Sequence, residues 1–240
     1  MSQDLKLFVT TEHSCGYYPD RKARNLVPGP DTRMSVSLFS ALIEHGFRRS
    51  GDFVYRPHCL ECRDCRPCRI KVEEFRWRRR HKRCLKRNSD LDVRVMPACF
   101  TYEYYDLYRK YQNGRHPGGG MANPLPEDFK RFLLSHLENT VFLEFRHGHK
   151  LLGVAVTDAT DVGLSAMYTF FDPAESGRAL GNFAILQQIR LAASRQLPFL
   201  YLGYWINNHS KMHYKAGYQP LEVLHNGQWR VFDGKSEKFC

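Results

Sequence analysis

Residues 164–205 read LSAMYTFFDPAESGRALGNFAILQQIRLAASRQLPFLYLGYW, and this stretch decides the fold. Its first part, 164–171, is rich in apolar and aromatic residues and predicts a strand. Residues 179–195 place apolar side chains at helical spacing and predict a long helix that can cover a sheet. Residues 199–203 then predict another strand. The stretch therefore indicates a strand, a covering helix and a returning strand.

The segments on either side extend this pattern. Two further strands are predicted at 141–146 and 151–157, joined by turn-like residues. A short helix is predicted at 208–215, followed by closing strands at 218–223 and 229–232. This order is similar to that of the GNAT acyltransferases, whose mixed sheet is splayed where the acyl donor binds. We therefore predict an α/β (α+β) fold with a GNAT-like mixed sheet.

The amino-terminal part is more irregular. Helices are predicted at 35–45, 101–112 and 126–137, because apolar side chains recur there on one face. Short strands are predicted at 53–55, 69–75 and 91–96. We divide the chain into a small basic, Cys-rich amino-terminal domain, residues 1–100, and a GNAT-like domain, residues 101–240.

Composition excludes several classes of protein. The 240 residues are 42% hydrophobic and 25% charged, which is typical of a globular protein and not of a disordered or fibrous one. No run approaches the roughly 18 consecutive apolar residues of a membrane span, and the first residues lack the pattern of a signal peptide. We therefore expect a cytoplasmic protein without a membrane partner, in which the eight cysteines are free thiols or metal ligands.

Positive charge is concentrated in one segment. The formal net charge is +11, and residues 56–87 hold thirteen Lys and Arg against four Asp and Glu. Such density is costly unless a polyanion lies opposite, because like charges at helical spacing repel. We predict contact with nucleic acid; the alternative is a solvated basic face without a partner. The predicted contacts are Arg76, Arg78, Arg79, Arg80, Lys82, Arg83, Lys86 and Arg87.

The turn before the long helix bears on the acyl donor. GNAT enzymes use an Arg/Gln-x-x-Gly-x-Gly/Ala turn, in which backbone amides at the helix start hold a diphosphate. Here the equivalent residues are Arg178-Ala-Leu-Gly181-Asn-Phe183, and Phe183 stands where the backbone should be bare. We interpret this as loss of the acetyl-CoA site in favour of another activated acyl donor, one carried by RNA. An acetyl-CoA-dependent N-acetyltransferase remains an alternative.

Several segments together resemble one family, the aminoacyl-tRNA-protein transferases, and most closely its bacterial aspartate/glutamate leucyltransferase branch. Each segment is weak alone, but their order and spacing are specific and cover nearly the whole chain. They are Cys15-Gly-Tyr-Tyr-Pro-Asp-Arg-Lys-Ala-Arg24, Ser40-Ala-Leu-Ile-Glu-His-Gly-Phe-Arg-Arg-Ser-Gly51, Tyr55-Arg-Pro-His-Cys-Leu-Glu-Cys-Arg-Asp-Cys65, Arg87-Asn-Ser-Asp-Leu91, Met167-Tyr-Thr-Phe-Phe-Asp-Pro173, Tyr201-Leu-Gly-Tyr-Trp-Ile206 and Lys211-Met-His-Tyr-Lys215.

The resemblance implies a reaction. An aminoacyl group passes from tRNA to the α-amine of a protein that begins with Asp or Glu, which marks that protein for degradation. Leucine from Leu-tRNA is expected in the bacterial branch, whereas eukaryotic relatives transfer arginine. No cofactor is required for this chemistry, because the aminoacyl-tRNA is itself the activated co-substrate. The alternative from another class is a non-catalytic, metal-stabilised RNA-binding module.

Site residues follow from this chemistry. An α-amine has a pKa of about 7.7–8.0, so catalysis can rest on positioning and on stabilising the oxyanion, without a strong base. The polar candidates beside the cleft are Asp172, Tyr168, Tyr201 and Asn207. The acidic first residue of the acceptor needs a cation. Lys211 and Lys215 would share one face of a helix, with Tyr214 beside them; Arg21 and Tyr18 are the second choice.

Four cysteines are metal-ligand candidates: Cys15, Cys59, Cys62 and Cys65. C-x-x-C spacing lets two thiolates chelate one ion, either zinc or the iron of an iron-sulfur cluster. In eukaryotic relatives an amino-terminal C-x-x-C and a later Cys pair hold such a cluster, but Tyr18 stands here at the second position of the first pair. Reduced structural thiols are the alternative.

Overall fold

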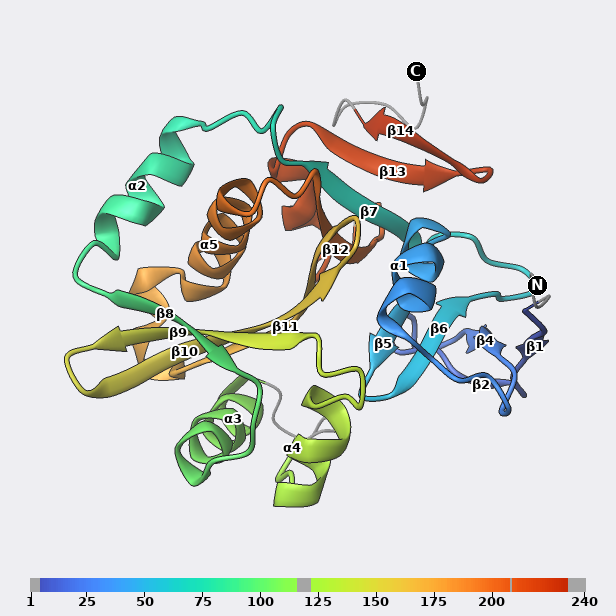
Figure 1. The fold of residues 1–240 in the computed structure, drawn as a ribbon, viewed down its shortest axis with the longest axis horizontal. Helices are drawn as coiled ribbons and strands as arrows, with labels where there is room; N and C mark the ends of the chain where they lie inside the picture. Colours follow the sequence, from blue (N-terminus) through green and yellow to red (C-terminus); the bar gives the residue numbers. More distant parts are fainter. Residues whose placement is uncertain (1–4, 116–121, 208, 233–240) are drawn as a thin grey trace.

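The computed structural model describes residues 5–115, 122–207 and 209–232. Its centre is a twisted mixed sheet with helices on both faces, and a smaller sheet built from the amino-terminal residues lies beside it (Figure 1). None of the helices among the described residues combines the length and the apolar character that a bilayer crossing requires.

The described part of the main sheet has eight strands, and only one neighbouring pair is parallel. That pair is β11 (Gly163–Phe171) and β12 (Phe199–Trp205). The long helix α5 (Leu180–Ser194) connects them, as the sequence predicts. In sheet order the strands are β14 (Gln228–Phe232), β13 (Leu221–His225), β7 (Arg66–Lys71), β12, β11, β10 (Lys150–Thr160), β9 (Thr140–His147) and β8 (Asp92–Pro97).

Helices cover the two faces of this sheet. On one face α5 packs beside α2 (Arg79–Arg87), and their apolar residues join a core with β7 and β12. On the other face lie α3 (Tyr102–Arg115) and α4 (Pro126–Leu133) (Figure 1). Their buried side chains form a largely aromatic core with the sheet. Pro126 at the first turn and the Asp128 carboxylate, which accepts from the Leu125 amide, fix the start of α4.

The amino-terminal unit combines a four-stranded sheet with one helix. The strands are, in order, β1 (Leu7–Val9), β4 (Asn25–Pro28), β6 (Phe53–Pro57) and β5 (Arg48–Ser50). A separate ladder joins β2 (His13–Ser14) and β3 (Lys22–Ala23). Helix α1 (Val36–Glu44) begins at Ser35, whose hydroxyl accepts from the Leu38 amide, and it buries Phe39, Leu42 and Ile43.

The structure confirms most of the predicted elements and corrects one. The predicted helix at 208–215 is wrong: in its place residues His213–Gly217 form a short 3-10 helix, η2, and Asn208 lies outside the described residues. Two strands that precede residue 100, β7 and β8, belong to the main sheet. The division predicted at residue 100 therefore runs through this sheet, because β7 pairs with both β12 and β13. The chain has a mixed α/β fold.

Candidate functional site

The two parallel strands of the main sheet pair over only three residues. Gly163, Leu164 and Ser165 of β11 lie opposite Phe199, Leu200 and Tyr201 of β12. Beyond this point β12 has a register shift against β7, and Gly203 lies within it with φ +73°. This left-handed conformation favours glycine. The strands therefore diverge toward their carboxyl ends and leave an opening inside the sheet.

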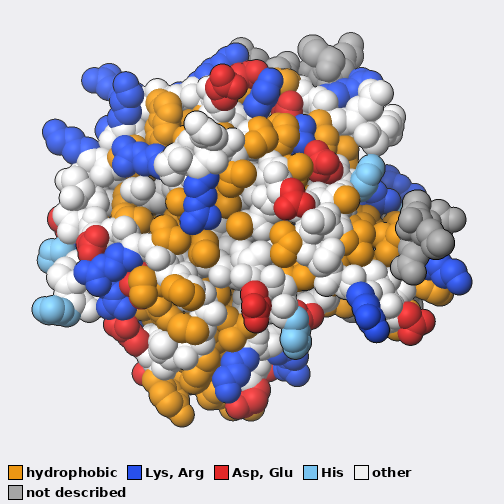
Figure 2. Space-filling view, in the orientation of Figure 1, with side chains coloured by type: hydrophobic (Ala, Val, Ile, Leu, Met, Phe, Trp, Pro, Cys, Tyr) orange, Lys and Arg blue, Asp and Glu red, His pale blue; other side chains and the backbone are white. Residues whose placement is uncertain are grey.

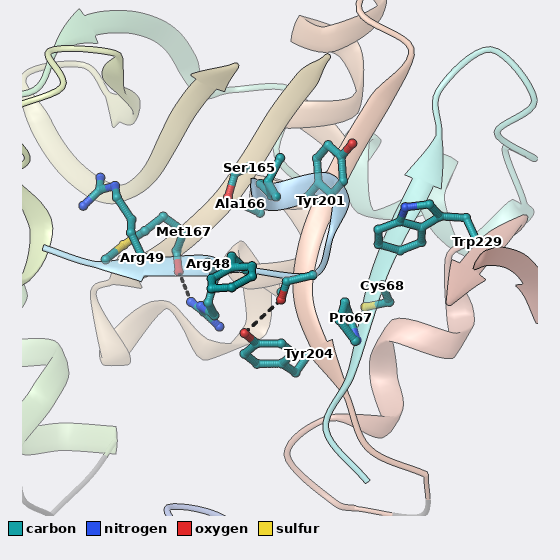
Figure 3. A pocket seen from close by; sticks show the side chains of 14 residues that line it. Arg48, Arg49, Pro67, Cys68, Ser165, Ala166, Met167, Tyr201, Tyr204 and Trp229 are labelled. Atoms are coloured by element: carbon teal, nitrogen blue, oxygen red, sulfur yellow. Dashed lines mark hydrogen bonds between the residues drawn. The ribbon is translucent and has the colours of Figure 1, made fainter. Parts of the chain in front are cut away.

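Arg48 of strand β5 occupies this opening. Its Nη2 donates to the carbonyl oxygen of Met167 on β11 at 3.0 Å, and its guanidinium lies 5.8 Å from the ring of Tyr204 on β12 (Figure 3). A Cβ atom added at Gly203 would lie 2.7 Å from Arg48 Nη1, so the side chain needs the glycine beside it. The cavity that remains is about 10 Å³, enough for about one water molecule.

Arg48 lies among phenols, and the Asp158 carboxylate, which also raises its pKa, is paired with Arg49. Burial alone would lower the pKa of Arg48, but the nearby phenols of Tyr55, Tyr17 and Tyr204 raise it overall. Burial also raises the pKa of Tyr17 to about 12. Across the described residues no carboxylate forms an ion pair with Arg48. A partly buried cation without an anion is a ready site for an acidic group, because pairing would offset the loss of solvation.

Two motifs from opposite ends of the chain meet next to this opening. The rings of Tyr17 and Tyr18 lie edge-on to His209, with centroids 5.7 and 5.6 Å apart. Arg21 lies over the Tyr18 ring at 4.0 Å and donates to the Asp64 carboxylate at 2.9 Å. The two predicted acceptor-binding groups are thus close in space, although the Arg21 charge already has a partner.

Lys211 and Lys215 do not share a face, which corrects the helix geometry expected from their spacing. Lys211 is exposed in a turn that precedes η2, whereas Lys215 is 5% exposed and donates to the Tyr204 carbonyl oxygen. Burial lowers the pKa of Lys215 to about 8. Tyr214 remains partly exposed beside them. Lys215 therefore holds the backbone of β12 next to Arg48 and has little surface to offer a substrate.

The four catalytic candidates lie in different surroundings. The Asp172 carboxylate accepts from the Ala174 amide and pairs with Lys110 at 2.7 Å and with Lys150. Burial alone would raise the pKa of Asp172, but its bonds to the Lys110 ammonium and to that backbone amide lower it. Asp172 thus has the contacts of a structural residue.

The remaining candidates are two phenols and one amide. The Tyr168 hydroxyl accepts from the Gln112 amide at 2.9 Å on the α3 side of the sheet. Tyr201 contacts Arg69 and Trp229, away from Tyr168. Asn207 comes two residues after the end of β12. These contacts do not bring the four candidates into one constellation, and their roles stay predictions.

Sequence reasoning missed Arg48 as a site residue. The available signal was the pair Arg48-Arg49 inside a short strand, where successive side chains point to opposite sides. Arg49 points into the core and Arg48 into the opening (Figure 3), so a strand that should bury apolar groups instead buries one cation fully and a second one in part. Gln112 was also missed; it is a fully buried residue of α3 and donates to the Tyr168 hydroxyl.

The basic helix α2 presents its charges to solvent. All eight predicted RNA contacts are exposed, and the described residues supply none of them with a carboxylate partner. Lys and Arg side chains gather over α2 at the upper left of Figure 2. Arg80 donates to the Gly217 carbonyl, two residues after Lys215, so the basic face is joined directly to the segment beside the opening.

Comparison with protein families decides between the alternatives. The carboxyl-terminal domain of the arginine-tRNA-protein transferases matches residues 103–225, and the amino-terminal domain of the same proteins matches residues 13–83. The chain belongs to the arginine-tRNA-protein transferase family. The resemblance inferred from the sequence motifs is thereby confirmed.

Relatives within this transferase family are similar over almost their full length. An aspartate/glutamate leucyltransferase of Stenotrophomonas maltophilia (strain R551-3) is 49% identical over 236 residues, which are 96% of this chain and 94% of that protein. The aspartate/glutamate leucyltransferase of Alcanivorax borkumensis is 50% identical over 226 residues, 94% of this chain and 93% of that protein.

Among solved structures, that of L-PGS from Bacillus licheniformis is similar at a TM-score of 0.46 and 8% sequence identity. The match covers 61% of this chain and 46% of that chain.

The cysteines of this transferase gather without forming a metal site in the ranges the structure describes. Burial raises the pKa of the Cys65 thiol to about 12, with Cys15, Cys62 and Cys59 close enough to add to this effect. Arg21 donates to Cys62 Sγ at 3.4 Å. No three His, Cys, Asp or Glu side chains among those residues are arranged to hold an ion. The donors as placed do not fit a metal, and the zinc or iron-sulfur site stays a prediction.

The stereochemical argument from Phe183 was wrong. Its ring is 1% exposed and packs on Phe145 in the core, 5.1 Å between centroids, so it leaves the start of α5 clear. A different feature opposes a diphosphate. Arg178, the first residue of the turn, is paired with the carboxylates of Asp90 and Glu175. These carboxylates neutralise the positive charge of Arg178 that a bound diphosphate would need.

Proposed function

We propose that this chain is an aspartate/glutamate leucyltransferase: it transfers leucine from leucyl-tRNA to the α-amine of proteins that begin with Asp or Glu. The proposal is supported by relatives of that name that are about 49% identical over nearly the whole chain. The reaction belongs to the cytoplasm, where it marks its acceptors for degradation. The main sheet acts as a GNAT-like acyltransferase sheet, and the transfer site lies at the mouth of the opening between β11 and β12 that Arg48 occupies.

One observation supports the requirement for Asp or Glu as the first residue of the acceptor. The Arg48 guanidinium lies at the opening and has no carboxylate partner among the residues described. The carboxylate of an Asp or Glu side chain would supply the missing negative charge through a charge-assisted bond. The phenols of Tyr17 and Tyr204 lie near the same guanidinium, but the Tyr204 hydroxyl already donates to the carbonyl oxygens of Gly46 and Tyr55, so Arg48 itself supplies the donors for the carboxylate. An acceptor with a neutral first side chain would leave Arg48 unpaired and would bind more weakly.

The transfer itself needs no strong base. The α-amine nitrogen attacks the carbonyl carbon of the aminoacyl ester, and a C–N bond forms. The ester C–O bond then breaks, and the ribose hydroxyl of the tRNA leaves with the proton that the amine loses. Because an appreciable fraction of an α-amine is neutral near its pKa of about 7.7–8.0, positioning supplies most of the catalysis.

The donor is proposed to lie along the basic helix. Phosphates contact the exposed cations of α2, and the aminoacyl end passes the Arg80–Gly217 contact to reach the opening. This route differs from that of acetyl-CoA, whose diphosphate would have to displace Asp90 and Glu175 from Arg178. The donor is thus recognised by its phosphodiester backbone.

The donor is tested by mass spectrometry of a peptide that begins with Asp after incubation with leucyl-tRNA, arginyl-tRNA or acetyl-CoA. The expected result is a gain of one leucine with leucyl-tRNA alone. A gain of arginine would keep the mechanism and overturn the leucine assignment, and acetylation would overturn the choice of donor. Tight tRNA binding with no gain from any donor would favour the non-catalytic RNA-binding module. An Asp peptide with a blocked α-amine serves as the matched control.

A further inference from the structure

Trp77, just before α2, is an exposed aromatic ring with a rigid support. Its side chain is 38% exposed. The ring packs edge-to-face on Phe75, with centroids 4.9 Å apart and an angle of 89°. Phe75 is itself buried and stacks on His81 at 5.2 Å. The indole is therefore held in place by the core while much of its surface faces solvent.

Three exposed cations lie close to this ring in the sequence or in space. Arg76 and Arg78 flank it in sequence and are exposed, and the Arg190 guanidinium of α5 lies 5.9 Å from the ring centroid. Within the described ranges none of the three is paired with a carboxylate. An accessible indole among unpaired guanidinium groups has the chemistry of a platform for a nucleic-acid base: the ring stacks on the base while the cations bind the phosphates on either side.

We propose that Trp77 stacks on an unpaired base in the single-stranded 3′ end of the tRNA. The inference rests on the proposed function, since the 3′ end carries the leucyl ester and must approach the opening. Arg80, three residues after Trp77, contacts Gly217 beside that opening, so the platform and the transfer site lie along one basic surface. Bases inside a duplex present only their edges, whereas an unpaired end exposes the faces that stacking requires.

The test compares RNA hairpins with a short 3′ overhang, a short 5′ overhang or a blunt end, without an amino acid attached. Binding is measured by fluorescence anisotropy for the wild type, Trp77→Ala and Trp77→Phe. Trp77→Ala should weaken binding of the 3′-overhang hairpin about fivefold to a hundredfold, the range that corresponds to the loss of one stacked base. Binding of the blunt hairpin should be unchanged, and Trp77→Phe should retain most of the affinity because its ring can still stack.

Tyr102→Ala is the matched control, because this side chain is more exposed than Trp77 and lies on α3, on the other face of the main sheet. It should not alter binding of any hairpin. An equal loss for blunt and 3′-overhang hairpins, no loss at all, or a loss confined to the 5′ overhang would overturn the proposal. Because these RNAs carry no leucine, a failure of leucyl transfer would remove the proposed function without changing this result.

Discussion

The ion pair between Arg49 and Asp158 should be the strongest single tie between the amino-terminal unit and the main sheet. Both side chains are fully buried. Arg49 donates to the two carboxylate oxygens at 2.9 and 2.6 Å, to Thr140 Oγ1 at 2.9 Å, and to the carbonyl oxygens of Gly51 and Leu133 at 3.1 and 3.2 Å. Arg49 thereby links β5 to β9, β10 and the end of α4.

Arg49→Met tests this tie. The substitution leaves a buried carboxylate whose remaining described partner is the Thr140 hydroxyl at 2.8 Å, together with two carbonyl groups that lose their donor. Breaking one side of a buried pair typically costs about 3–5 kcal/mol, against a total stability of about 5–15 kcal/mol. The free energy of unfolding should fall by about that amount. The midpoint of urea unfolding should then fall by roughly 1–2 M.

The controls separate burial from charge. Arg94→Met removes an exposed pair with Asp92 and should cost less than about 1 kcal/mol. The double variant Arg49→Met/Asp158→Leu no longer buries an unpaired charge and should recover part of the lost stability. A loss below about 1 kcal/mol for Arg49→Met, or a double variant less stable than Arg49→Met, would refute the assignment of this pair as the main tie.

Three further predictions concern the site and the basic helix. Arg48→Met should lower kcat/KM for an Asp peptide about tenfold to a hundredfold, while an Asn peptide is affected little; an equal loss for both peptides would indicate a purely structural role. Replacing Arg79, Lys82, Arg83 and Lys86 of α2 by Gln should weaken tRNA binding. The slope of log K against log [salt], measured by titration at several salt concentrations, should become less steep by about 0.7–0.9 per lost phosphate contact. The same change at Lys130 and Arg131 of α4 should alter neither the affinity nor the slope. Burial lowers the pKa of Lys215 to about 8, whereas the pKa of a lysine in an unfolded chain is about 10.4. Between these two pH values the unfolded state binds more protons than the folded state. The free energy of unfolding of the wild type should therefore rise with pH relative to that of Lys215→Met. Urea unfolding at several pH values in that range measures the difference, and a constant difference would contradict the burial of the ammonium group.

The sequence predicted those strands and helices whose apolar pattern lies within a single segment. The strands β9, β10 and β11 and the helix α5 follow from runs of apolar residues that stay within one segment. The 3-10 helix at His213–Gly217 was misread as a longer helix, because spacing alone does not reveal how the chain turns. That error placed Lys215 on one helix face with Lys211, whereas Lys215 is buried and Lys211 is exposed.

The sequence did not predict which side chains from distant segments come together in the fold. Arg48 comes into the opening only because β5 docks beside the diverging ends of β11 and β12, more than a hundred residues away in the sequence. Phe183 was judged from a motif position, but the rotation of α5 turns its ring into the core. The exposure of the basic helix was easier to anticipate, since residues 76–87 hold eight cations and no acid that could pair with them in the core.

A competition experiment tests whether the enzyme requires an acidic first residue in its acceptor. Two peptides that differ only in their first residue, Asp or Asn, compete for leucyl-tRNA in one reaction with this chain, and the products are separated by mass. We expect leucine on the Asp peptide and almost none on the Asn peptide, because only the carboxylate can pair with Arg48. Equal leucine on both peptides would contradict it.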